Sequence, residues 1–91
     1  MAKIHPTAIV DSGAEIADDA EIGAYCVVEG DTVVGPGCVL RSHAVVRRYT
    51  HLGRGNRLDS FVVLGGEPQD LKFDSKTVSW LRIGDDNLFR E

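Results

Sequence analysis

A six-residue period runs through the first two-thirds of this chain. Every sixth residue from position 4 to position 64 is isoleucine, valine or leucine. These positions are Ile4, Val10, Ile16, Ile22, Val28, Val34, Leu40, Val46, Leu52, Leu58 and Leu64. Because these residue types make up only about a quarter of ordinary sequence, the unbroken run is not a chance pattern. The period constrains the fold more strongly than any other feature of the sequence.

A period of six excludes the two commonest secondary structures as the source of the pattern. An amphipathic helix repeats near 3.6 residues and a strand alternates every two, so neither singles out each sixth residue. A hexapeptide coil does, because a short strand and a turn repeat along a triangular prism of about three hexads per coil. Compact residues, suited to the inside of a corner, lie four positions after each aliphatic. They are Ala8, Ala14, Ala20, Cys26, Thr32, Cys38, Ala44, Thr50, Asn56 and Val62. We therefore expect an all-β parallel β-helix with coils about 4.8 Å apart.

The pattern breaks after Leu64 and begins again at Ile83, three hexads and one residue later. We predict a single β-helix domain over residues 1–91, with about five coils. Its expected parts are hexads over 4–64, an external loop over 66–80 and a resumed coil over 81–91. Trp80 is expected to pack the loop against the coil wall. Loops on a rigid scaffold are favoured places for function, so the loop is the first candidate for a site.

Other residues with chemical potential fit the coil better than a reactive site. Cys26 and Cys38 fall in the compact inward column, and their spacing gives neither a zinc motif nor a disulfide framework. The three histidines, His5, His43 and His51, fall in different columns without metal-ligand spacing, so no metal site is predicted. Four glycines one position after an aliphatic are expected at corners, where a left-handed backbone is needed. They are Gly23, Gly35, Gly53 and Gly65.

Charge is unevenly distributed along the chain. The net charge is −4, which argues against a nucleic-acid binder. Residues 41–58 nevertheless hold five arginines and no acid: Arg41, Arg47, Arg48, Arg54 and Arg57. This block is either a solvated face or a docking place for an anionic partner. The apolar stretches are too short for a membrane span and no signal peptide is visible, so a cytoplasmic protein is expected.

Two segments carry a specific resemblance. IHPTAIVDSGAEIADDAEIGAYCVV resembles the opening of hexapeptide-repeat acyltransferases. VLRSHAVVRRYTHLGRGNRL, followed by LGGEPQDLKF and the closing IGDDNLFRE, resembles the UDP-N-acetylglucosamine O-acyltransferase family of lipid A synthesis. The resemblance covers essentially the whole chain, and GEPQDLKF is its most specific part. It implies that the β-helix is left-handed, an exception to the right-handed crossover rule.

The resemblance also implies an activity. The family transfers a 3-hydroxyacyl chain from acyl carrier protein to the 3-hydroxyl of UDP-N-acetylglucosamine. It acts as a homotrimer of parallel prisms with active sites between subunits, and it uses no metal or organic cofactor. Gln69, Asp70 and Lys72 match the loop residues that contact the sugar nucleotide. Their chemistry suits this role, because an amide and a carboxylate can hold sugar hydroxyls and an ammonium can meet a phosphate.

One departure from the family limits the expected activity. The family's general base is a histidine in a later I-N-x-H-x-x-H-D stretch, which this sequence does not contain. Since none of the three histidines corresponds to it, we expect no catalytic residue and no acyl transfer by this chain alone. Two readings stay open. The chain is the N-terminal portion of the acyltransferase, or it is a non-catalytic scaffold. Such a scaffold is a short β-helix that self-associates, or one that binds the sugar nucleotide or acyl carrier protein without turnover.

The last coil gives a further expectation about assembly. A sequence that stops inside a coil leaves unpaired strand edges and an apolar cross-section. We therefore expect a homo-oligomer, either a side-by-side trimer or an end-to-end contact. Phe89, the last inward residue, is expected to matter for the end-to-end contact.

Overall fold

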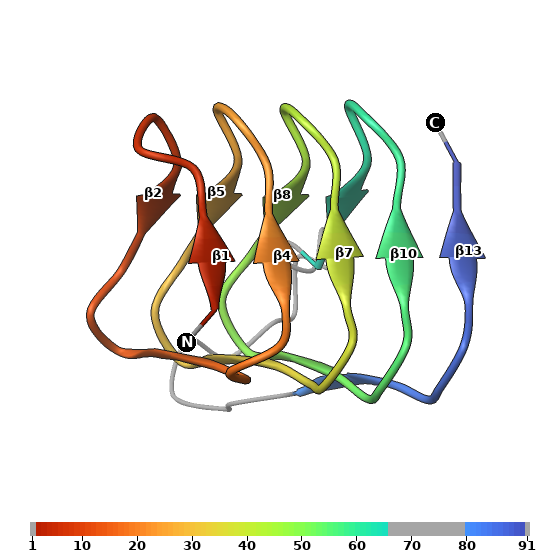
Figure 1. Cartoon of the computed structure of the whole chain (residues 1–91). Helices are drawn as coiled ribbons and strands as arrows, with labels where there is room; N and C mark the ends of the chain where they lie inside the picture. The colour runs from red at the N-terminus through yellow and green to blue at the C-terminus, as the bar shows by residue number, and fades with distance from the viewer. Residues whose placement is uncertain (1, 66–79, 91) are drawn as a thin grey trace, which may run out of the picture.

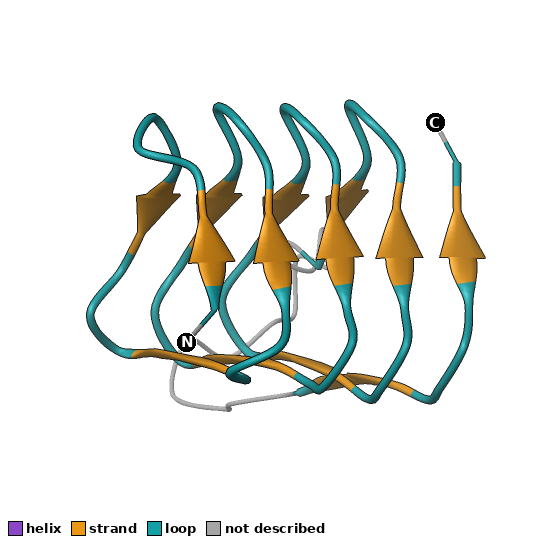
Figure 2. Ribbon diagram, viewed as in Figure 1, coloured by secondary structure: helices purple, strands orange, loops and turns teal. Residues whose placement is uncertain are grey.

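The computed structural model describes residues 2–65 and 80–90, which form thirteen short parallel strands and no helix. Figure 2 shows short strands joined by loops and turns in the described parts of the chain. Each strand is two or three residues long because every hexad forms one side of a triangle and then turns a corner. None of the described residues belongs to a helix that could cross a bilayer.

The strands form three sheets, one for each side of the prism. Sheet A contains β1 (Lys3–Ile4), β4 (Glu21–Ile22), β7 (Val39–Leu40), β10 (Arg57–Leu58) and β13 (Leu88–Phe89). Sheet B contains β2 (Ile9–Val10), β5 (Val27–Val28), β8 (Val45–Val46) and β11 (Val63–Leu64). Sheet C contains β3 (Ala14–Ile16), β6 (Thr32–Val34), β9 (Thr50–Leu52) and β12 (Leu81–Ile83).

The coil winds with the hand that the family resemblance implies. In Figure 1 the strands of sheet A rise on the near side, and the chain passes over the top to sheet B behind. Successive coils advance from β1 towards β13, which makes the winding left-handed. The expected all-β, left-handed parallel β-helix of hexapeptide repeats is therefore confirmed.

The number of coils is smaller than the expected five. Thirteen strands taken three at a time give four complete coils and one strand of a further coil. The reason lies between β11 and β12, where the chain advances from Leu64 to Leu81. β12 pairs directly with β9, so no coil is added over that interval.

The inward aliphatic column forms the core, as its period predicts. In sheet A, Ile22 aligns with Leu40 and Leu40 with Leu58, and each of these side chains is at most 2% exposed. The compact column fills the corners, where both Cys26 and Cys38 are completely buried and free. Burial raises the pKa of both thiols, so they are held as inert, protonated core residues. Phe89 is half-buried on Leu58 at the last coil.

The prediction about the corner glycines was wrong for three of the four, Gly23, Gly35 and Gly53. The left-handed residue is the third after the inward aliphatic, and it is usually not glycine. The residues at this position with positive φ are Tyr25, Asp31, Gly37, His43, Tyr49, Gly55, Phe61 and Asp86. Glycine one position after the aliphatic serves close stacking instead, because a Cβ on Gly35 would collide with the carbonyl oxygen of Gly53 in the next coil. Of the four predicted glycines, only Gly65 has a positive φ, of 85°.

Candidate functional site

The three residues that the sequence predicts for substrate binding, Gln69, Asp70 and Lys72, lie outside the described residues. The predicted division into hexads, loop and resumed coil stays a prediction for the same reason. What the structure does place is the two ends of that segment. β11 ends at Leu64 in sheet B and β12 begins at Leu81 in sheet C, so both ends lie at the corner between these sheets.

Aromatic and cationic side chains gather where the chain re-enters the coil. The rings of Trp80 and Tyr49 meet edge to face with centroids 5.6 Å apart. The Arg48 guanidinium lies 4.9 Å from the centre of the Tyr49 ring and donates a 3.0 Å hydrogen bond to the Tyr49 hydroxyl. The backbone N–H of Leu81 donates to the Tyr49 carbonyl at 2.8 Å. Trp80 therefore packs on the coil wall, as expected for the residue that precedes the resumed strand.

The corner at which the chain leaves the coil differs from the equivalent corner one coil earlier. Gly65 occupies the position one coil after Arg47, but with positive φ, and a Cβ there would lie 2.5 Å from Thr50 Oγ1. Among the buried side chains of the described residues, Thr50 has a hydroxyl with no hydrogen-bond partner. Its counterpart one coil earlier, Thr32, donates to the carbonyls of Arg47 (3.3 Å) and Gly30 (3.2 Å). The hydrogen bond that Thr32 donates at the inner corner is therefore not repeated by Thr50, which lies next to Gly65, where the chain leaves the coil.

The arginine block is partly neutralised by acids of the neighbouring coils. Three of the five arginines pair with acids: Arg41 with Asp59 (3.5 Å), Arg47 with Glu29 (2.7 Å) and Arg48 with Asp31 (3.0 Å). The hydrogen bond from Arg47 holds the pKa of the Glu29 carboxyl below its usual range. Arg54 and Arg57 have no ion pair within residues 2–65 and 80–90. Of the two interpretations, the pairing favours a solvated face over docking of an anionic partner.

The three histidines make separate, structural contacts. His5 Nδ1 shares a 2.8 Å hydrogen bond with the Thr7 hydroxyl, which also accepts the backbone N–H of Tyr25. His43 is stacked between two aromatic rings, and His51 Nδ1 lies 3.4 Å from Arg82 Nη1. No group of His, Cys, Asp and Glu within the described part of the chain could hold a metal ion. These contacts provide no activated base.

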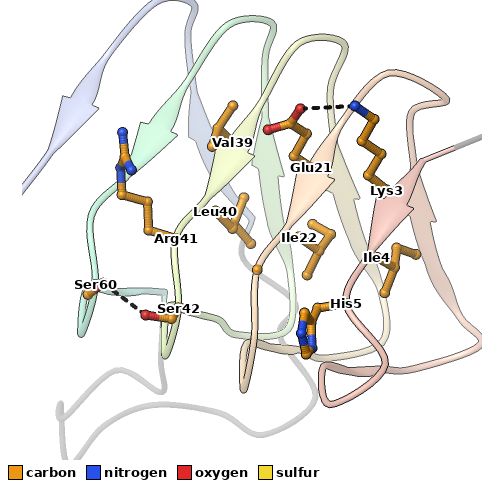
Figure 3. Close-up of a pocket in the computed structure, with 11 residues that line it drawn as sticks. Lys3, Ile4, His5, Glu21, Ile22, Val39, Leu40, Arg41, Ser42 and Ser60 are labelled. Carbon is orange, nitrogen blue, oxygen red and sulfur yellow. Dashed lines mark hydrogen bonds and ion pairs between the residues drawn. The ribbon is translucent and has the colours of Figure 1, made fainter.

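A hollow of about 600 Å³ lies along sheet A and the corner that follows it. Figure 3 shows two pairs among its polar side chains, while His5 and Arg41 are not paired with another of the side chains drawn. Lys3 lies 3.9 Å from Glu21, and the Ser42 and Ser60 hydroxyls are 3.2 Å apart. Because these two pairs satisfy each other and lie on an open surface, the hollow offers little for binding a small molecule.

The sequence interpretation missed one surface feature, the outer face of sheet B. A period of six places the residues before each inward aliphatic in one column, which mixes the three faces of the prism. Reading that column at every eighteenth residue separates the faces and finds Ile9, Val27, Val45 and Val63 together on sheet B. The signal was therefore present, at three times the period that revealed the fold.

Comparison with known families agrees with the hexapeptide interpretation. Residues 13–48 match the family model described as bacterial transferase hexapeptide (six repeats). These residues cover parts of the first three coils and include the buried residues Ile22, Val28, Val34 and Leu40.

Comparison with individual proteins extends this similarity to the whole chain. The chain is 45% identical over all 91 residues to the acyl-[acyl-carrier-protein]–UDP-N-acetylglucosamine O-acyltransferase of Psychrobacter sp. strain PRwf-1, covering 35% of that protein. It is 47% identical over 89 residues to the protein of the same name from Syntrophobacter fumaroxidans, covering 34% of it. The solved structure of LpxA from Acinetobacter baumannii matches with a TM-score of 0.91 and 43% identity, over 97% of this chain and 34% of that one. The chain thus spans about a third of the length of the relatives it matches.

Proposed function

This chain is a hexapeptide-repeat homologue, along its whole length, of the UDP-N-acetylglucosamine O-acyltransferases, and from that premise we propose that it supplies coils of such an enzyme. The reaction is transfer of a 3-hydroxyacyl chain from acyl carrier protein to the 3-hydroxyl of UDP-N-acetylglucosamine, in lipid A synthesis. The observation that carries the proposal is the 45% identity over all 91 residues, together with a coil that superposes at a TM-score of 0.91 on an LpxA structure.

Within this proposal the substrate residues are Gln69, Asp70 and Lys72. The amide and carboxylate hold sugar hydroxyls, and the Lys72 ammonium meets a phosphate oxygen. The positions of β11 and β12 support this assignment indirectly, because they anchor both ends of the segment to the corner between sheets B and C. A rigid coil on both sides limits the positions that the segment can reach.

The same proposal assigns no general base to this chain. His5 is bound to Thr7, His43 lies between two rings and His51 contacts Arg82, so each imidazole already has a structural contact. The chain on its own therefore binds the sugar nucleotide without turnover. It assembles with copies of itself as a parallel trimer. A cytoplasmic location is part of the proposal and agrees with two cysteines that are free and buried.

An acyl-transfer assay tests this function directly. The full chain is incubated with a 3-hydroxyacyl carrier protein and UDP-N-acetylglucosamine, with and without a longer homologue as a positive control. We expect no product from the chain alone. Turnover above background that Asp70→Ala abolishes would contradict the claim that a histidine absent from this chain is required.

A second candidate function is a non-catalytic scaffold that binds acyl carrier protein. The arginines that lack an ion pair in the described part, Arg54 and Arg57, favour it, because carrier proteins are acidic. An exchange to glutamine at both positions separates the two candidates. Loss of carrier-protein binding with unchanged sugar-nucleotide binding supports the scaffold, whereas unchanged carrier-protein binding excludes these arginines as its contact.

A further inference from the structure

The last two strands of sheet A border a hollow that the proposed function does not use. Its volume is about 360 Å³, which is within the range of small-ligand sites. The charged residues that line it are three arginines and two aspartates, so the lining keeps one positive charge. They are Arg41, Arg57, Arg90, Asp59 and Asp86. The hollow thus combines room for a small molecule with an excess of guanidinium groups.

The register of the coils brings the three arginines to one end of this hollow. The backbone N–H of Arg41 bonds to the next coil just before Asp59, and that of Asp59 bonds just before Arg90, both at 2.9 Å. These three residues are therefore neighbours in one column, with Asp59 in the middle. Arg57 precedes Asp59 by two residues, so its side chain emerges on the same side of the strand. The second aspartate, Asp86, lies at the other end, in the corner before β13.

The ion pair at the arginine end is weak and leaves most of the donors free. In Figure 3 the Arg41 side chain extends towards β10, where its Nε lies 3.5 Å from Asp59 Oδ1. The two side chains are 59% and 38% exposed, and an exposed pair of this kind contributes little to stability. Arg57 and Arg90 make no ion pair with any residue of 2–65 or 80–90. An anion can bond to these donors without breaking a strong pair.

The arginines at the corner between sheets B and C are already in use, unlike those of sheet A. Arg47 donates to Glu29 at 2.7 Å, and Arg48 donates to Asp31 at 3.0 Å. These bonds explain why that part of the arginine block is a solvated face. On sheet A, Arg90 comes from outside the block and adds a further guanidinium beside a single acid.

A phosphate group fits this arrangement better than a carboxylate does. A guanidinium presents parallel N–H donors that match two oxygens of either anion. Arginines that approach from three coils need oxygens in several directions, which a tetrahedral phosphate has and a planar carboxylate lacks. Leu88 is outward, 54% exposed and aligned with Arg57 on the neighbouring strand. It adds an apolar wall for the carbon part of a phosphate monoester.

We propose that the hollow at Arg41, Arg57 and Arg90 binds a phosphate group, either as inorganic phosphate or at the end of a small monoester. Asp59 competes with that phosphate for the guanidinium groups and so limits the affinity. The site goes beyond the proposed acyl transfer, because the segment with the proposed substrate residues leaves and re-enters the coil at the corner between sheets B and C.

Nuclear magnetic resonance of the full chain tests the site with inorganic phosphate as the probe. The arginine Nε–H signals are followed during a titration at pH 7, with sodium chloride holding the ionic strength constant. We expect saturable shifts at Arg57 and Arg90 and none at Arg82, which lies on sheet C. Arg57→Gln and Arg90→Gln should each weaken the phosphate affinity at least fivefold. Arg82→Gln makes the same change of charge and should alter it less than twofold.

Asp59→Asn should have the opposite effect. Removing the competing carboxylate should strengthen phosphate binding at least threefold. Asp18→Asn, which neutralises an exposed carboxylate between β3 and β4, is the matched control and should change the affinity less than twofold. Phenyl phosphate distinguishes the two sources of the group. Tighter binding than inorganic phosphate assigns a monoester, and equal or weaker binding assigns the free ion.

Three results would overturn the site. The first is the absence of saturable shifts at Arg57 and Arg90. The second is equal affinity in the three glutamine variants, or equal gains in the two asparagine variants, because phosphate would then respond only to net charge. The third is displacement of phosphate by saturating UDP-N-acetylglucosamine, which would place it at the sugar-nucleotide site. Circular dichroism and urea unfolding confirm that each variant is folded.

Discussion

The inner and outer walls of the same strands follow different rules. On the inner wall Leu40, Val46 and Leu52, from sheets A, B and C, are all aliphatic and at most 1% exposed. On the outer wall the preceding residues differ from face to face, and only sheet B stays apolar along its whole length. The six-residue period therefore specifies the prism, while the eighteen-residue period specifies what each face of the prism can contact.

The largest expected effect on stability comes from shortening side chains of the inner wall, in sheets A and C. Leu40→Ala in sheet A and Leu52→Ala in sheet C each remove a fully buried side chain and leave a cavity. We expect each to lower the free energy of unfolding by about 2–5 kcal/mol. Val39→Ala on the outer wall of sheet A is the matched control, with an expected loss of under about 1 kcal/mol. Urea unfolding measures all three, and a similar loss at Val39 would contradict the division into two walls.

The fold could be predicted from the sequence because the inner wall leaves so little choice. The position that Leu58 occupies must point inward in every coil. The residue at the position of Gly35 must be small, because the next coil passes directly over it. The number of coils and the identity of the corner residue were not predictable in the same way. Tyr25, His43 and Phe61 adopt a positive φ that their residue types do not favour, so the coil imposes it on them.

The next prediction concerns Asn56, a buried asparagine at an inner corner. The Asn56 amide donates to the Gly84 carbonyl at 2.7 Å and its oxygen accepts the Asn87 N–H at 2.9 Å. It thus fixes the re-entering coil on the one below it. Asn56→Ala is expected to lower the free energy of unfolding by about 1–3 kcal/mol, because it removes both of these hydrogen bonds between the coils.

Hydrogen exchange locates the effect of that change. The amide of Asn87 should lose protection in Asn56→Ala, while the amide of Val39, a coil earlier, should keep it. Asn56→Asp retains the acceptor for Asn87 and serves as a partial rescue. Equal loss of protection at both amides would mean that Asn56 stabilises the whole coil rather than the re-entry.

Thr32 and Thr50 are buried in equivalent positions of successive coils. Replacing them by valine should change the free energy of unfolding by smaller amounts, in opposite directions. Thr50→Val removes a hydroxyl that has no partner in the described structure and should raise the free energy of unfolding by about 1 kcal/mol. Thr32→Val removes a hydroxyl that donates to Arg47 and should lower it by a similar amount. Thermal unfolding of the two variants side by side measures the difference. Equal effects would show that Thr50 is hydrogen-bonded in solution.

The smallest expected effect on the free energy of unfolding comes from the ion pair between Glu29 and Arg47 on the outer wall. This effect depends on pH. The Arg47 hydrogen bond lowers the pKa of Glu29 in the folded chain, so the pair stabilises the fold above the ordinary glutamate pKa of about 4.3. This contribution is lost as the pH falls through the lowered folded pKa. Glu29→Gln should therefore cost about 0.2–1 kcal/mol at pH 7 and almost nothing near pH 2. A cost that is the same at both pH values would contradict the assignment to the ionised carboxylate.

The candidate site was less predictable than the fold, for a physical reason. Gln69, Asp70 and Lys72 have no periodic position in a coil, so their role came only from the resemblance. The corner at which the coil resumes could have been anticipated in part, because Trp80 comes shortly before the resumed hexad. Its contact with Tyr49, and the cation of Arg48 over that ring, depend on which corner the chain leaves and could not be read from spacing.

The most direct test of the proposed function is an isothermal titration of the full chain with UDP-N-acetylglucosamine. Wild type and Asp18→Asn, an exposed control in another corner, should show the same saturable binding. Asp70→Asn and Lys72→Met should each weaken the affinity at least tenfold. Absence of saturable binding to the wild type, or equal affinity in all four proteins, would contradict the account.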